Sequence, residues 1–368
     1  MDIQWMLPQD MDQVGRLWQE CFCDPQSYAD FYFRTMPGQN RILGLKEKER
    51  LISMIHLNPY VLSADGRRFD STYIVGVATD AAYRHQGHMR RLLDRTFECL
   101  YGERQPMAYL MPADPKIYEP FGFRYIYQQF YIKMPAANTL GEYLRAAGDV
   151  GLRAYSASPA DARQLAEWAN DCLGSRMDVF TWRDERYYDN LLRETASDGG
   201  EVLMFYEGER LVGTAAYIAE ETYEVREILA YPGYEPRLVE WLAGHLGDRA
   251  GMMLMPPWKA DEAGVENGFR PMIMGRILYL ESFLRLLRFD READHLCLEV
   301  KDDLIQENNG SFRIVIRNGK AEKVTRLDHP EAGCLKVTVE MLMQAAFGQG
   351  SALQGIQPFE HIFINEIV

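Results

Sequence analysis

The residues best suited to chemistry gather where an expected strand leads through a basic turn into an expected helix. The apolar run from Tyr73 to Thr79 has strand character, and a glycine turn rich in arginine, Arg84 to Arg91, follows it. Apolar side chains then recur at helical spacing, namely Met89, Leu92, Leu93, Phe97 and Leu100. Free N–H groups at a helix start, beside a glycine and cations, suit a pyrophosphate. The order therefore predicts a site for a phosphorylated ligand, although α/β proteins without such a ligand also contain it.

Two familiar nucleotide sites are excluded in this stretch. It contains neither the glycine-rich loop that ends in Gly-Lys-Ser/Thr nor the pattern G-x-G-x-x-G. A nucleotide-hydrolysing site or a dinucleotide site is therefore not predicted here.

The strand and the turn together resemble a known motif. Val77-Ala78-Thr79 followed by Arg84-x-x-Gly87-x-Met89 is similar to the acyl-CoA motif of the GCN5-related N-acetyltransferases, the GNAT superfamily. In that family the strand splays from its neighbour, its backbone pairs with the pantetheine arm, and the turn wraps the pyrophosphate. Met89 departs from the family pattern, which has a small residue there. The resemblance implies acetyl-CoA as cosubstrate, bound by Val77, Ala78, Thr79, Arg84, His85, Gln86, Gly87, His88, Met89, Arg90, Ala113 and Asp114.

A second motif contains a candidate acid. Ile117-Tyr118-x-x-Phe121-Gly122-Phe123 resembles the signature of the enhanced-intracellular-survival (Eis-like) branch of the superfamily. The resemblance implies that Tyr118 protonates the leaving CoA sulfur. A phenol with a pKa near 10 is a suitable donor to a thiolate whose thiol has a pKa of about 8.5 or above. The alternative is that Tyr118 is a core aromatic beside Phe121 and Phe123.

The base that accepts the amine proton is less evident. In the Eis-like branch the C-terminal carboxylate reaches the active site, where it accepts that proton or anchors the catalytic tyrosine, so the resemblance implies this role for Val368. The tail from Pro358 to Val368 is apolar and strand-like, as a buried ending would be. It ends in valine, whereas branch members often end in an aromatic residue. Alternative bases are Glu366, His56 and Glu119.

The length of 368 residues predicts two or three domains. We expect an α/β fold with mixed sheets: a catalytic GNAT domain over 1–135, a second GNAT domain over 150–282, and a sterol-carrier-like α+β domain over 288–368. In the first unit we expect a helix over 10–18 and strands over 50–62, 69–79, 107–111 and 125–132.

The second unit contains an echo of the first. Leu254-Met255-Pro256 and Gly268-Phe269-Arg270 repeat Leu110-Met111-Pro112 and Gly122-Phe123-Arg124, which indicates a duplicated domain. The second copy lacks the Arg-x-x-Gly turn and the tyrosine, so we interpret it as degenerate and non-catalytic. We expect a helix over 157–173, a hairpin over 202–215 and a strand over 225–231.

The third unit is expected to contain strands over 296–300, 310–316 and 335–339 and a helix over 340–347. It resembles the sterol-carrier-like C-terminal domain of the same branch. Its role stays open between a carrier of lipid and a structural lid with an oligomer surface.

Composition narrows the class of partners. The formal net charge of −14 argues against general nucleic-acid binding and is compatible with a cationic amine substrate. No apolar run approaches the roughly 20 residues that span a bilayer, and Met1 to Trp5 shows no secretion signal. We interpret the 6 scattered cysteines as free thiols in a reducing cytoplasm.

These observations predict an acetyl-CoA-dependent N-acetyltransferase that needs no metal. The acceptor is a primary amine of an aminoglycoside or polyamine, or a lysine side chain, and it attacks directly in a ternary complex. The resemblance also implies a homo-oligomer, a trimer or hexamer. Two alternatives are a non-catalytic CoA-binding regulator and a carrier of a hydrophobic ligand.

Overall fold

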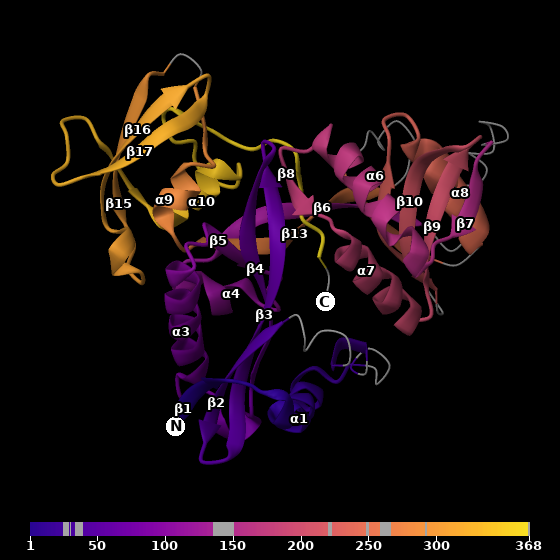
Figure 1. The fold of residues 1–368 in the computed structure, drawn as a ribbon, viewed down its shortest axis with the longest axis horizontal. Helices are drawn as coiled ribbons and strands as arrows, with labels where there is room; N and C mark the ends of the chain where they lie inside the picture. Colours follow the sequence, from indigo (N-terminus) through magenta and orange to yellow (C-terminus); the bar gives the residue numbers. More distant parts are fainter. Residues whose placement is uncertain are drawn as a thin grey trace.

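The computed structural model describes residues 1–24, 29, 31–33, 40–134, 151–219, 223–247, 250–257, 266–290 and 293–366. Its elements form three units around two sheets (Figure 1). Two of the units share the larger sheet, and the third has a sheet of its own. Among the described residues, no helix is long and apolar enough to cross a bilayer.

The larger sheet runs through the first two units. The first contributes β1 (Asp2–Trp5), β2 (Arg41–Glu47), β3 (Arg50–Ala64), β4 (Arg67–Thr79), β5 (Met107–Leu110) and β6 (Arg124–Met134). The second contributes β7 (Arg153–Ser156), β8 (Val179–Trp182), β9 (Glu201–Glu207), β10 (Arg210–Ala219), β11 (Tyr223–Ala230), β12 (Gly251–Met255) and β13 (Asn267–Ile277). Their order is β1-β2-β3-β4-β5-β13-β6-β12-β11-β10-β9-β7.

The final strands of the two units are exchanged. β13 pairs antiparallel with β5 of the first unit, from Met274 opposite Leu110 to Ile277 opposite Met107. β6 pairs antiparallel with β12 of the second unit, and β6 and β13 also pair with each other. The two units are therefore fused through their sheets. The domain boundaries at 1–135 and 150–282 stay a prediction, because the larger sheet contains strands from both units.

The expected first-unit elements form for local reasons. The two-residue loop Asp65-Gly66 has positive φ at both positions, 47° and 77°, which suits a hairpin turn between β3 and β4. Helix α1 (Met11–Phe22) buries Val14, Leu17 and Trp18. Helix α3 (His88–Gly102) buries most of its predicted apolar stripe, while Met89 stays partly exposed.

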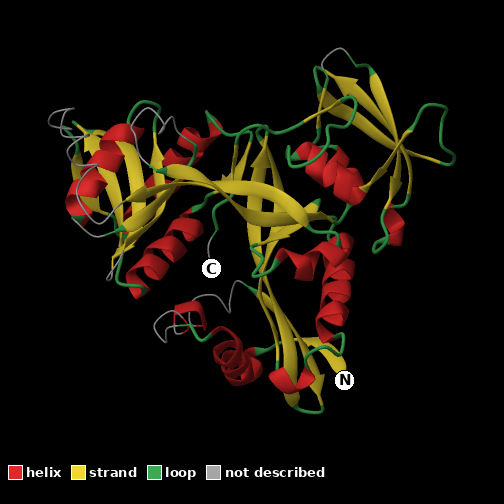
Figure 2. Cartoon of the chain, turned by 180° about the vertical axis from the view of Figure 1, so that it is seen from behind, coloured by secondary structure: helices red, strands yellow, loops and turns green. Residues whose placement is uncertain are grey.

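The remaining helices cover the sheets. They are α4 (Pro115–Tyr118), α6 (Ala162–Gly174), α7 (Glu185–Ser197), α8 (Glu235–Leu246), α9 (Leu280–Leu284) and α10 (Val339–Ala346), with short 3₁₀ turns at Pro8–Asp10, Ala81–Tyr83, Glu119–Phe121, Pro159–Asp161 and Gln306–Asn308. Figure 2 shows the helices packed against the strands from the opposite side. The predicted α/β fold class is confirmed.

The third unit has a sheet in the order β18-β15-β16-β17-β14-β19. Its strands are β14 (Arg288–Phe289), β15 (His295–Lys301), β16 (Gly310–Arg317), β17 (Lys320–Leu327), β18 (Leu335–Thr338) and β19 (Ile356–Gln357). The sequence interpretation missed β17, because its exposed face breaks the apolar run. A last short strand, β20 (Ile362–Phe363), leaves this unit and pairs with β8.

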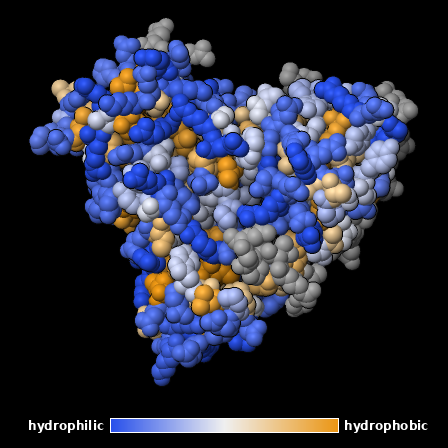
Figure 3. Space-filling model, in the orientation of Figure 1, coloured by the Kyte–Doolittle hydropathy of each residue, from blue (hydrophilic) through white to orange (hydrophobic). Residues whose placement is uncertain are grey.

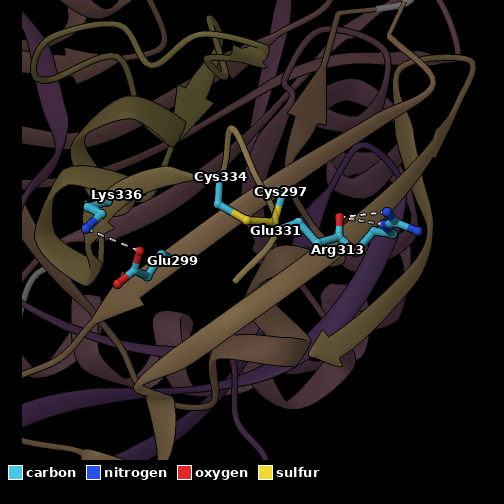
Figure 4. The surroundings of a disulfide bond; sticks show 6 residues. All are labelled: Cys297, Glu299, Arg313, Glu331, Cys334 and Lys336. Atoms are coloured by element: carbon cyan, nitrogen blue, oxygen red, sulfur yellow. Dashed lines mark hydrogen bonds and ion pairs between the residues drawn. A yellow bond between two sulfur atoms is a disulfide. The ribbon is translucent and has the colours of Figure 1, made fainter. Parts of the chain in front are cut away.

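One prediction about the cysteines is wrong. Cys297 and Cys334 form a disulfide, shown in Figure 4 between the ion pairs Glu299–Lys336 and Arg313–Glu331. The reason is strand register: β15 and β18 run parallel with Leu298 opposite Leu335, so the preceding cysteines face each other with Cα atoms 4.5 Å apart. The other four, Cys21, Cys23, Cys99 and Cys172, are free thiols as predicted.

Candidate active site

An opening between β4 and β5 is the first part of the site. The two strands pair in parallel only at Thr72 opposite Ala108 and Tyr73 opposite Tyr109. Beyond this point β4 continues to Thr79 paired only with β3 among the described strands. The backbone of β4 from Ile74 onward therefore presents N–H and C=O groups that an extended ligand can pair with. The splay predicted from the family resemblance is present.

A bulge re-aims the backbone inside this opening. Val75 lies opposite His56 and Ala78 opposite Met54, so β4 contains an extra residue at this point. Gly76 adopts φ +57°, and a Cβ atom there would lie 2.5 Å from the Trp18 ring and 3.1 Å from the His56 ring. Bulges re-aim groups next to active sites. An N–H group at this bulge, beside Val77, is suited to polarise a thioester carbonyl.

Gly76→Ala is expected to destabilise the protein more than Gly66→Ala and to weaken acyl-CoA binding. Both glycines have positive φ, so both variants lose roughly 1–2 kcal/mol of unfolding free energy from backbone strain. A Cβ at Gly66 meets nothing within 4 Å, whereas one at Gly76 displaces Trp18. Chemical denaturation and CoA titration measure the two effects. Equal destabilisation with unchanged CoA affinity would show that the bulge tolerates a side chain.

The basic turn stands at the start of α3. Gly87 has φ +78° and caps the helix without a side-chain hydrogen bond, so the first-turn N–H groups lack helical partners. The turn is exposed except for Met89, which is half-buried, and His88, which is buried with both ring nitrogens unpartnered among the described residues. The Arg84 Nε donates to the Thr79 carbonyl at 3.0 Å, which holds the turn against the end of β4.

The other residues predicted to contact CoA lie in the basic turn and in the turn after β5. The Arg90 guanidinium lies over the Phe121 ring, 4.6 Å from its centroid. Ala113 and Asp114 are exposed in the turn after β5, and the Asp114 carboxylate caps α4 by accepting from the Lys116 N–H at 2.9 Å. His85 and Gln86 are exposed, and the Gln86 amide donates to the Ala82 carbonyl. The arrangement fits a phosphorylated ligand between the turn and β4.

Tyr118 lies at the end of α4 with 9% of its surface exposed. Its ring meets the Phe123 ring edge to face, with centroids 6.0 Å apart. Burial raises the pKa of Tyr118 to about 12, so its hydroxyl stays protonated throughout the neutral range. The tyrosine is thus a core aromatic and, at the same time, a protonated donor. Its catalytic role stays a prediction.

The C-terminal tail enters between the first two units (Figure 1). β20 pairs with β8, and β8 also pairs with β3. The Tyr73 hydroxyl donates to the Glu366 carbonyl at 3.1 Å, at the last paired position before β4 and β5 separate. Val368 lies outside the described residues, so the role of its carboxylate stays a prediction.

The alternative bases differ in their surroundings. His56 is fully buried, and burial lowers its pKa to about 3, so its imidazole is neutral. Its Nδ1 contacts the Tyr32 hydroxyl at 3.0 Å. Glu119 is exposed. Glu366 is 5% exposed and lines a cavity.

That cavity has a volume of about 450 Å³ and lies between β3, α7 and the tail. Its wall includes the carboxylates of Asp70, Glu103, Asp184, Glu194, Glu227 and Glu366, and the guanidiniums of Arg41, Arg186 and Arg226. Aromatic rings complete the wall, namely Phe31, Tyr32, Tyr60, Trp182 and Tyr187. Figure 3 shows hydrophilic side chains prevailing over much of the visible face of the molecule, with smaller hydrophobic patches between them. The cavity is acidic and aromatic, as a site for organic cations is.

The second unit supplies residues that the sequence interpretation did not consider. Glu194 lies on α7, and burial raises its pKa to about 7, with Arg226 acting in the opposite direction. Tyr60 joins the cavity to the splay. Its ring centroid lies 6.1, 6.4 and 6.3 Å from those of Tyr73, Tyr109 and Tyr187. Because the second unit lacks the Arg-x-x-Gly turn, the sequence interpretation treated it as non-catalytic and assigned no site residues to it. The acidic residues of 184–194 were the feature of the sequence that could have indicated this contribution.

Comparison with known proteins agrees with this geometry. Residues 2–126 match the acetyltransferase (GNAT) domain family, and residues 280–355 match the sterol carrier protein domain family. A search of curated proteins finds no match.

Three solved structures share the fold over nearly the whole chain. A probable N-acyltransferase from Enterococcus faecalis is 19% identical, with a TM-score of 0.79 and 98% of each chain covered. A GCN5-related N-acetyltransferase from Kribbella flavida is 16% identical, with a TM-score of 0.75 over 94% of this chain and 90% of that one. Eis1 from Mycobacterium abscessus is 18% identical, with a TM-score of 0.71 over 95% and 90%.

The first domain therefore belongs to the GNAT superfamily, and the chain is an acyltransferase. The chain also has a sterol carrier protein domain towards its C-terminal end, and it shares its overall fold with Eis1.

Proposed function

We propose that this protein transfers an acetyl group from acetyl-CoA to a primary amine of a small polycation of the aminoglycoside or polyamine type, or of a lysine side chain. The observation that carries the proposal is the junction at Tyr73. There the splay of β4 and β5, which suits the thioester arm, meets the acidic cavity, which suits an organic cation.

The donor is held by backbone and by charge. Acyl-CoA pairs its pantetheine arm with β4 beyond Tyr73 and places its pyrophosphate at the start of α3. The N–H groups near Val77 and Gly87 supply the hydrogen bonds, and Arg84 and Arg90 supply positive charge. The acyl carbon then lies near Tyr73, where proximity and alignment lower the barrier.

The acceptor is selected by charge and by ring faces. Six carboxylates against three guanidiniums give the cavity wall a negative balance, which attracts ammonium groups. Tyr60, Trp182 and Tyr187 offer faces on which a cation can rest. The neutral amine attacks the thioester in a ternary complex, and Tyr118 protonates the leaving thiolate. The Val368 carboxylate anchors Tyr118.

Release of free thiol from acetyl-CoA tests this function. We expect release that depends on an added amine and is fastest with polyamines and aminoglycosides, compared with lysine peptides and with uncharged alcohols as a blank. Release that is independent of amine would contradict acyl transfer. Binding of CoA without any release would favour a regulator instead.

The other alternative, a carrier of a hydrophobic ligand, concerns the third unit. A hollow of about 900 Å³ there is lined both by charged side chains, among them Glu299, Lys301, Arg326 and Lys336, and by apolar ones, among them Val300, Leu327 and Met341. A homo-oligomer, trimeric or hexameric, stays a prediction.

A further inference from the structure

The described tail ends on an unpartnered buried carboxylate. Glu366 is 5% exposed, and neither of its carboxylate oxygens has a hydrogen-bond partner among the described residues. Its side chain is part of the wall of the acidic cavity. Buried charges in proteins are normally paired, so an unpaired one points to a partner that arrives with a ligand.

The other carboxylates of the wall are engaged. Glu103 pairs with Arg41, Asp184 accepts from the Tyr187 N–H, Glu194 faces Arg226, and Glu227 binds Arg183 through both oxygens. Asp70 is exposed at the rim. Among the described residues, Glu366 is therefore the buried carboxylate of this cavity whose charge has no dedicated partner.

Within the described parts of the chain, the neighbours of Glu366 do not supply a free cation. Arg183 is the near guanidinium, and it is already committed to Glu227 at 2.7 Å and 2.5 Å. The Thr181 hydroxyl lies beside the carboxylate and acts to lower its pKa, against the larger effect of burial. The negative charge of Glu227 also raises the pKa of Glu366. Other titratable groups nearby among the described residues are the phenols of Tyr60, Tyr73, Tyr109, Tyr127 and Tyr187. Burial raises the pKa of Glu366 to about 7, which makes it a stronger base than an exposed glutamate.

Its position relative to the reacting atoms is set by its own backbone. The Glu366 carbonyl accepts the Tyr73 hydroxyl at 3.1 Å, and the Tyr73 ring stacks on Tyr109 with centroids 5.0 Å apart. These two tyrosines form the last rung before β4 and β5 separate. Glu366 is thus fixed at the junction of the splay and the cavity.

We propose that Glu366 is the general base of the reaction, taking the first proton from the acceptor ammonium before attack. The inference rests on the proposed function. The ammonium gives one proton to a Glu366 oxygen, and the neutral nitrogen then bonds to the acyl carbon. The carbon–sulfur bond breaks, the thiolate takes the Tyr118 proton, and the second nitrogen proton replaces it on Tyr118. One proton remains on the amide, and Glu366 releases the first to solvent.

The test is the pH dependence of kcat in Glu366→Gln. The wild-type kcat is expected to rise with pH through about 7, because the base works only when deprotonated. The variant is expected to lose at least about 100-fold in kcat at neutral pH, the usual contribution of a general base. The loss of kcat in the variant is expected to be smaller at higher pH and with weakly basic amines, because such amines are already neutral and need no base. Acyl-CoA affinity stays unchanged.

Two further variants keep the result decisive. Glu360→Gln removes an exposed carboxylate of the same tail and is expected to behave as wild type. Glu366→Asp keeps a carboxylate and is expected to retain the rise with pH at reduced rate, which also decides the case if Glu366→Gln melts early. A higher acceptor KM with unchanged kcat would overturn the proposal and make Glu366 a recognition residue. Wild-type protein without amine-dependent thiol release would instead overturn the proposed function itself.

Discussion

Tyr118→Phe is expected to lower turnover at saturating acyl-CoA by at least two orders of magnitude. The change removes one hydroxyl and leaves the buried ring, so the contacts with Phe123 and the stability of the fold are retained. Loss of a positioned general acid typically costs 10²- to 10⁴-fold. Steady-state kinetics with the preferred amine measures the effect, and thermal denaturation confirms the fold.

A neighbouring tyrosine serves as control for this prediction. Tyr125→Phe removes a half-buried hydroxyl from the start of β6, and we expect wild-type turnover. Since the pKa of Tyr118 lies at about 12 through burial, the acid stays protonated and adds no pH dependence between 6 and about 10. Unchanged kcat in Tyr118→Phe would remove Tyr118 from the mechanism.

Deleting Ile367 and Val368 is expected to abolish turnover while acyl-CoA affinity and melting temperature stay close to wild type. The tail is held upstream of the deletion, by pairing of Ile362 and Phe363 with β8 and by the Asp178 carboxylate. Asp178 accepts from the N–H groups of Glu360 and His361 at 2.8 and 3.1 Å. The deletion therefore moves the terminal carboxylate from Val368 back to Glu366, without releasing the rest of the tail.

Val368→Ala is the matched control for the deletion. It keeps the main-chain carboxylate at the same position and changes only the side chain, so it is expected to turn over normally. Full activity in the deleted protein would show that the Val368 carboxylate has no role. Loss of activity in both variants would assign the effect to the valine side chain.

Much of the first unit follows from local patterns. The apolar residues of 50–62 and 69–79 and the turn at Asp65-Gly66 between them predict the hairpin of β3 and β4. The helical spacing from Leu92 to Leu100 predicts α3. The glycine turn and the strand before it were accordingly predictable, because each depends on residues close in sequence. The bulge at Gly76 was not predicted and became known only from the pairing of β4 with β3.

The rest depends on contacts between distant segments. The exchange of β6 and β13 involves strands more than 130 residues apart. The sequence of each strand is that of an ordinary final strand of its own unit, so it does not indicate the exchanged partner. Cys297 and Cys334 come together only through the parallel register of β15 and β18. The acidic cavity combines β3, α7 and the tail, so Glu194 and Glu366 became site residues only once the fold was known.

The central claim is that an acyl group passes from CoA in the splay to an amine in the acidic cavity. Mass spectrometry of the amine after incubation with isotope-labelled acetyl-CoA tests it most directly. The account predicts one labelled acetyl group on a polyamine or aminoglycoside for each free CoA released. Labelled acetate with an unmodified amine, or intact acetyl-CoA after long incubation with every amine, would contradict it.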